Sequence, residues 1–108
     1  MIEKNIYKKQ FPDWLIVGMN MGMIGLIVPE IRLITVGFDD ISKVVKIISH
    51  MDRVPTEVDF DDFEELSTVL IASNFGNFND VFFEIRYSPD GLLKDLEVLS
   101  GVVYCRKE

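Results

Sequence analysis

The chain has 108 residues, of which 48% are hydrophobic and 27% charged. This length and composition predict one globular domain, residues 1–108, and exclude a wholly disordered chain. Eighteen acidic residues against eleven basic ones give a net charge of −7. Such a charge repels nucleic-acid phosphates, so it disfavours direct nucleic-acid binding and favours a basic protein as partner.

Cysteine content and hydropathy bear on the cellular compartment. The single cysteine, Cys105, has no second thiol to pair with in the chain, which fits a reducing environment. The uncharged run 14–28 has 15 residues and is shorter than the roughly 18–20 that a membrane-spanning helix needs. Asp13 at its edge and the lack of a small-residue cleavage site argue against a signal peptide. We therefore expect a cytoplasmic protein and no membrane partner.

The first element that the pattern predicts is a helix over residues 12–23. Its apolar residues recur at a spacing of three to four, and Pro12 suits the first helical turn. Gly18 and Gly22 each lower helix propensity by about 1 kcal/mol relative to alanine. Since small residues permit close packing, we expect this helix to approach a sheet closely.

Two strands follow. Residues 31–38 are rich in β-branched side chains with an alternating pattern, and residues 43–51 show the same period. The intervening Asp39-Asp40-Ile41-Ser42 has the composition of a turn. The two strands are therefore predicted to form a hairpin.

Residues 55–76 have the start, body and end of a long helix. Thr56 suits the N-cap, and Asp59 three residues later completes the short form of a capping box. Asn74 and Gly76 fit the exit, because both tolerate a left-handed backbone. The apolar positions at helical spacing form one stripe: Phe63, Leu66 and Leu70, flanked by Phe60, Val69 and Ile71.

The side of this helix opposite the apolar stripe is predicted to be acidic. Between Arg53 and Arg86 the chain has eight acidic residues and no basic one. A row of carboxylates is usually only a solvated face, but the lack of any compensating base favours a surface for a basic partner. The candidate partner-binding residues are Glu57, Asp61, Asp62, Glu64, Glu65, Asp80 and Glu84.

The rest of the chain predicts two further strands. Residues 81–87 form the third, with Val81, Phe83, Ile85 and Tyr87 facing inward. A turn at residues 88–91 and a short helical turn within residues 92–99 precede a last strand over 102–106.

The order of elements is α-β-β-α-β-β, in which each helix is followed by a hairpin. The simplest arrangement is an α+β domain with a four-stranded, mostly antiparallel sheet and both helices packed on one face. The other face of the sheet, or the helix side, is then free for a partner.

No motif for catalysis or for a cofactor is found. Phosphate loops, dinucleotide fingerprints and metal-binding histidine pairs are absent from the sequence, and the acidic helix lacks the spacing of a calcium loop. His50 lies near Asp52 but has no companion, so we interpret it as a surface or packing residue. Cys105 is expected to be an inert, partly buried thiol. The protein is therefore predicted not to be an enzyme, and to bind neither a cofactor nor a metal.

Three stretches carry a resemblance to a known group of proteins. They are Met19-Asn20-Met21-Gly22 through Ile27-Val28-Pro29-Glu30-Ile31-Arg32, His50-Met51-Asp52-Arg53-Val54-Pro55-Thr56, and Val102-Val103-Tyr104-Cys105-Arg106-Lys107-Glu108. In this order the chain resembles small bacterial immunity proteins of contact-dependent growth inhibition and related polymorphic toxin systems. The resemblance implies that the protein binds and neutralises the toxin domain of a cognate effector in the cytoplasm. Such toxins are often RNases or other nucleases, which are basic.

Two other classes of function are left open. The chain could be a non-catalytic adaptor or a self-associating interaction domain, for which a homodimer is one form. A small enzyme or ligand-binding domain would need convergent polar groups in a cleft between the helices and the sheet, and the sequence offers no such set.

Overall fold

The computed structural model describes residues 13–73 and 78–108. The elements in chain order are α1 (Asp13–Gly22), β1 (Ile31–Asp39), β2 (Val44–Met51), α2 (Glu57–Ser73), β3 (Asp80–Tyr87), a short 3-10 helix (Leu93–Asp95) and β4 (Gly101–Cys105). The expected helix-start residue Pro12 and the expected exit residues Asn74 and Gly76 lie outside the described residues.

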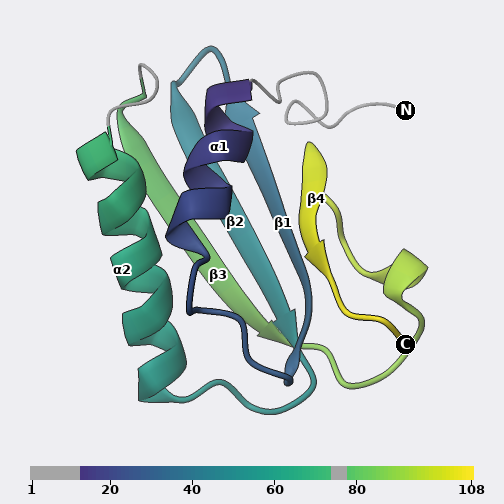
Figure 1. Ribbon diagram of the computed structural model, residues 1–108. Coiled ribbons are helices and arrows are strands. Elements are labelled where there is room, and N and C mark those ends of the chain that lie inside the picture. Colours follow the sequence, from purple (N-terminus) through teal and green to yellow (C-terminus); the bar gives the residue numbers. More distant parts are fainter. Residues whose placement is uncertain (1–12, 74–77) are drawn as a thin grey trace.

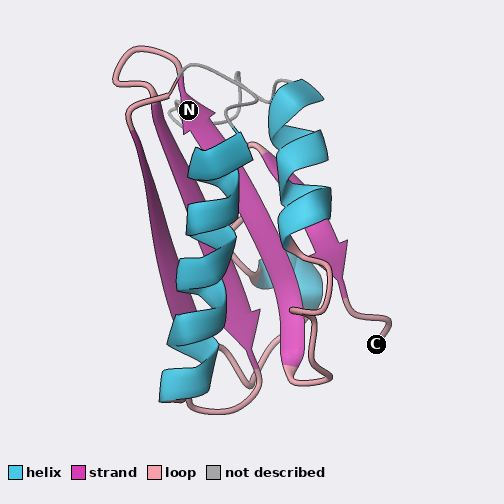
Figure 2. Ribbon diagram, turned by 60° about the vertical axis from the view of Figure 1, so that its left-hand side comes forward, coloured by secondary structure: helices cyan, strands magenta, loops and turns pink. Residues whose placement is uncertain are grey.

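The strands form one four-stranded sheet in the order β3-β2-β1-β4, and both helices lie against the same face of it (Figure 1, Figure 2). β1 pairs antiparallel with β2 and with β4, whereas β2 and β3 are parallel. The predicted α+β class, the mostly antiparallel sheet and the hairpin of β1 with β2 are therefore confirmed.

The prediction of a second hairpin, between the last two strands, is wrong. β3 and β4 are the two opposite edge strands of the sheet. α2 returns the chain along the sheet, so β3 starts beside the start of β2 and pairs with it in parallel, which requires a crossover of this kind. The connection of residues 88–100 then carries the chain to the far edge.

The main core lies between the helices and the sheet. Phe63, Leu66 and Leu70 of the apolar stripe of α2 are buried there as expected, whereas the flanking Phe60 and Ile71 are exposed. The expected close approach of α1 is made to α2 instead of to the sheet. A Cβ atom added to Gly22 would lie only 2.1 Å from Cδ1 of Leu66. Glycine at this position thus lets the two helices touch.

The second face of the sheet is also largely covered, contrary to the expectation of an open face. β1 is buried on both sides along almost its whole length. The connection 88–100 supplies the cover: the backbone N–H of Leu99 donates to Oγ1 of Thr35, and His50 contacts Ser88 and the carbonyl of Glu97. A partner therefore finds little free sheet on this side of β1.

β3 follows the predicted alternation except at its end. Val81 is buried, and the ring of Phe83 stacks on Phe63 of α2 at 6.0 Å between centroids. Tyr87 was expected to face inward, but it is exposed at the end of an edge strand, where neither helix reaches it.

Candidate binding surface

The N-terminus of α2 is fixed by a capping box extended by an arginine. The Thr56 backbone N–H donates to Oδ2 of Asp59 at 2.7 Å, and the Asp59 N–H reaches Oγ1 of Thr56 at 3.5 Å. Arg53 donates two hydrogen bonds to the same carboxylate, at 2.6 and 3.1 Å. These bonds, the one from Arg53 first, lower the pKa of Asp59, which is only 5% exposed. Asp59 is thus an acid that serves the fold.

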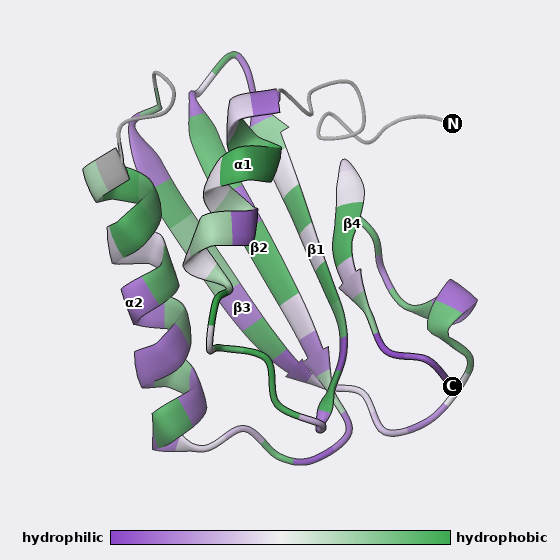
Figure 3. Ribbon diagram, viewed as in Figure 1, coloured by the Kyte–Doolittle hydropathy of each residue, from purple (hydrophilic) through white to green (hydrophobic). Residues whose placement is uncertain are grey.

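The other acids of α2 are placed differently. Glu57, Asp61, Asp62, Glu64 and Glu65, here called the acidic face, lie on the side of the helix turned away from the sheet. All but Asp62 are exposed, and none forms an ion pair with any residue in the described part of the chain. Figure 3 shows hydrophilic bands along α2. The structure therefore brings together five of the seven candidate residues.

Exposed apolar side chains flank the acidic face. Val58, Phe60 and Ile71 are exposed on α2, although the Phe60 ring also lies 6.4 Å from that of Phe83. A purely solvating surface does not need them, and their area adds to the binding free energy when a partner covers it. The outer side of α2 therefore combines unpaired carboxylates with apolar contact area.

The last two candidate residues do not belong to the acidic face. Asp80 is exposed at the start of β3 and accepts a hydrogen bond from the N–H of Val81. Glu84 lies on the opposite side of the sheet from α2, because its neighbours along β3 face the helices. Arg86 and Lys46 pair with Glu84 and, with Arg86 the stronger influence, lower its pKa. Glu84 is thus already neutralised within the fold.

A groove of about 150 Å³ opens between the end of α1, the turn after it and α2. We call it the interhelical groove. Apolar side chains and two carboxylates of the acidic face share its walls, and polar atoms form most of its exposed surface. The lining residues are Met21, Gly22, Ile24, Gly25, Leu26, Asp62, Glu65, Leu66 and Val69. The sequence pattern did not reveal it, because it depends on how closely two separate helices approach.

His50 is a packing residue, one of the two roles expected for it. Its ring is buried, with Nδ1 3.0 Å from Oγ of Ser88 and Nε2 3.1 Å from the carbonyl of Glu97. Burial lowers the pKa of His50, and a neutral ring that donates from Nε2 and accepts at Nδ1 satisfies both contacts. Asp52 pairs with Arg106 instead. Cys105, expected to be partly buried, is exposed on the edge strand β4.

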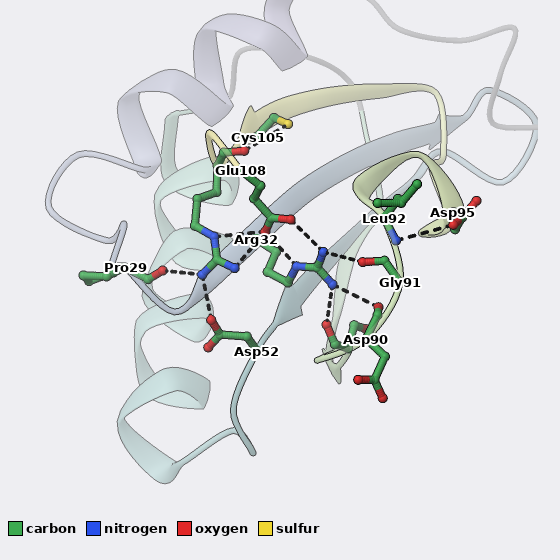
Figure 4. A network of polar contacts seen from close by, with 11 residues as sticks. Pro29, Arg32, Asp52, Asp90, Gly91, Leu92, Asp95, Cys105 and Glu108 are labelled. Carbon is green, nitrogen blue, oxygen red and sulfur yellow. Dashed lines mark hydrogen bonds and ion pairs between the residues drawn. The ribbon is translucent and has the colours of Figure 1, made fainter.

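A second charged cluster, also missed by the sequence pattern, lies where β1, β2 and the C-terminal residues meet (Figure 4). All five N–H groups of Arg32 are used, on both carboxylate oxygens of Glu108 and on the carbonyls of Ser88, Asp90 and Gly91. Arg106 binds Asp52 at 2.7 Å and also contacts Glu108. The bond from Arg32 and, more weakly, that from Arg106 lower the pKa of Glu108 to about 2.

The residues of this cluster, here called the C-terminal clamp, come from all three stretches that carry the resemblance to immunity proteins. Its charged members are Arg32, Asp52, Arg106 and Glu108. Each of these side chains has an opposite charge as partner, so the clamp accounts for these four residues of the stretches as features of the fold.

Neither a metal site nor a membrane span is found among residues 13–73 and 78–108. No group of three or more potential metal ligands gathers within these ranges. No described helix is both long and apolar enough to cross a membrane.

The family model of the MafI2 immunity protein matches residues 12–108. The chain belongs to the MafI2 immunity protein family. Its match spans nearly the whole chain and includes the acidic face, the interhelical groove and the C-terminal clamp. A search of the curated proteins found no match. The family supports function as an immunity protein and implies a toxin as partner.

Proposed function

We propose that this protein neutralises a basic toxin domain, in particular a nuclease such as an RNase, by binding it in the cytoplasm through the acidic face of α2. One observation carries the proposal. Five carboxylates stand on one side of a rigid helix with no ion-pair partner in the described part of the chain. The charges that the fold requires are paired, so these five are left for another molecule.

The chemistry of a nuclease fits such a surface. A nuclease cleft is positively charged because it has to hold phosphates, and a row of carboxylates can occupy it or cover its rim. The exposed Val58, Phe60 and Ile71 would be buried in the same contact and would lengthen the lifetime of the complex. Asp80, exposed at the start of β3, is the remaining candidate outside α2, whereas Glu84 acts within the sheet.

The test uses the toxin domain encoded next to this protein. Co-expression should restore growth of cells that produce the toxin, and the purified pair should bind. Charge reversal at Glu57→Lys, Asp61→Lys and Glu64→Lys together should slow association by roughly tenfold to a hundredfold at low salt. Wild-type association should also slow as salt rises, while dissociation changes less. Stopped-flow or surface-plasmon kinetics measures both rates.

A matched control makes the same change in charge elsewhere. Asp40→Lys, Asp90→Lys and Asp95→Lys together alter the net charge equally but lie outside α2. If this control slows association as much as the α2 variant, only the overall charge matters and the acidic face is not the interface. If the wild type neither rescues growth nor binds, the proposed partner is wrong. Light scattering of the free protein tests the alternative of a self-associating domain.

A further inference from the structure

We infer that the interhelical groove holds one long cationic side chain, a lysine or an arginine, of the toxin. This inference rests on the proposed function and makes one contact of the interface specific. The groove lies beside the acidic face, since Asp62 and Glu65 belong to both. A partner that covers the outer side of α2 therefore also covers the groove.

The size of the groove limits what can enter it. Its volume of about 150 Å³ corresponds to roughly five water molecules. Pockets for small-molecule ligands are larger, at about 300–1,000 Å³. A single long side chain therefore matches the groove, whereas a cofactor or a metabolite does not.

The walls suit an aliphatic stem. Met21 of α1 and Ile24 of the turn after it stand on one side, and Ile24 is 82% exposed. Leu66 and Val69 of α2 complete the apolar lining. Lysine and arginine lay their methylene groups along such surfaces while the charged head stays at a polar site.

The carboxylates select a cation. Asp62 and Glu65 are three residues apart on α2, so they project from the same side of the helix. Neither has an ion-pair partner among the described residues. An apolar side chain in the groove would strip water from these charges without compensating them, which is costly. A second copy of this chain is disfavoured as occupant, because its charge of −7 would repel the acidic face.

The occupant should act as an anchor that holds the formed complex. Desolvated charged contacts in well-packed pockets near an interface centre mainly set the dissociation rate. The groove and the exposed stripe of Glu57, Asp61 and Glu64 should therefore differ in kinetics. The stripe should govern association, and the groove should govern dissociation.

The experiment compares pairs of variants with equal changes. Asp62→Asn with Glu65→Gln removes the two groove charges, and Glu57→Gln with Asp61→Asn removes two charges from the stripe. The groove pair should dissociate from the toxin roughly tenfold to a hundredfold faster than the wild type, and the stripe pair less than about threefold faster. Val69→Trp should fill the groove with a similar effect, against Val102→Trp on β4 as a control with the same change outside α2.

Substitutions in the toxin complete the test. Each lysine and arginine of the toxin is changed to alanine in turn. One of these substitutions should raise the dissociation rate of the toxin from the wild-type protein but not its dissociation rate from the groove pair. The two effects on the dissociation rate should differ by at least about tenfold. If the wild type binds and no groove variant dissociates faster, the inference is overturned while the proposed function stands. If the wild type does not bind the toxin, both fail. If Val69→Trp does not fold, the dissociation rate of the groove pair alone tests the inference.

Discussion

The two groups of charged side chains in this protein, the C-terminal clamp and the acidic face of α2, have opposite arrangements. In the clamp, each of Arg32, Asp52, Arg106 and Glu108 has an opposite charge within hydrogen-bond distance. On the acidic face, none of the five carboxylates has an ion-pair partner in the described part of the chain. The difference separates charges that stabilise the fold from charges that the described part of the chain leaves without an ion-pair partner.

Burial explains the difference. Arg32 is only 3% exposed, and a guanidinium at such a site is tolerated only if its N–H groups are satisfied. The acids of α2 are hydrated by solvent and need no protein partner. The net charge alone cannot distinguish buried, paired charges from hydrated, unpaired ones, whereas the ion pairs in the structure do. Substitutions in the two groups should therefore affect different properties.

The largest loss of stability is expected for Arg32→Ala. The change removes five hydrogen bonds, leaves three backbone carbonyls without this donor and leaves Glu108 with the bonds from Arg106. Truncation of one partner in a buried charged network costs about 3 kcal/mol of unfolding free energy. Urea denaturation measures this loss. Asp61→Ala, from the acidic face, should change the unfolding free energy by less than about 0.5 kcal/mol. A loss below 1 kcal/mol for Arg32→Ala would contradict the structural role of the clamp.

A smaller loss of unfolding free energy is expected for Asp59→Asn. This substitution compares a paired acid with an unpaired one within the same helix, α2. Asp59 caps α2 and binds Arg53, whereas Asp61 two residues later does neither. Loss of a capping carboxylate costs about 1–2 kcal/mol, and Asp61→Asn should be nearly neutral. Equal effects of the two substitutions would show that the capping contacts add nothing to stability.

The pH dependence of this effect follows from the lowered pKa of Asp59. Because the folded state holds this carboxylate ionised below its ordinary pKa of about 3.9, its contribution is fully present above that value. It is lost as pH falls through the lower pKa of the folded state. The difference in unfolding free energy between wild type and Asp59→Asn should therefore shrink as pH falls below about 4. A difference that grows with acid would contradict the assignment.

Local features of the fold could be predicted from the sequence. The capping box of Thr56 and Asp59 and the apolar stripe of Phe63, Leu66 and Leu70 depend on residues three or four apart, so their spacing indicates them directly. The clustering of five carboxylates on one face of α2 follows from the same helical period. These predictions are confirmed by the structure, while a role of that face in binding stays a prediction.

Features that join distant segments could not be predicted. Arg32 and Glu108 are 76 positions apart, and no local pattern links them. The pairing of β2 with β3 depends on the crossover through α2, which the turn composition at residues 88–91 did not indicate. The interhelical groove exists only because Gly22 lets α1 meet Leu66 of α2. Each of these needs the relative placement of elements, which periodicity does not supply.

The smallest effect on the unfolding free energy is expected for two buried hydroxyl groups in the core, those of Thr35 and Ser49. They allow the same comparison, between a group with a partner and one without, for uncharged side chains. Thr35 donates to the carbonyl of Gly101 and accepts from the N–H of Leu99, whereas the hydroxyl of Ser49 has no hydrogen-bond partner among the described residues. A buried hydroxyl without a partner is destabilising, so Ser49→Ala should raise the unfolding free energy by up to about 1 kcal/mol, and Thr35→Val should lower it. Thermal or urea denaturation measures both changes. A clear loss of stability in Ser49→Ala would mean that having a partner does not decide what a polar group contributes to this fold.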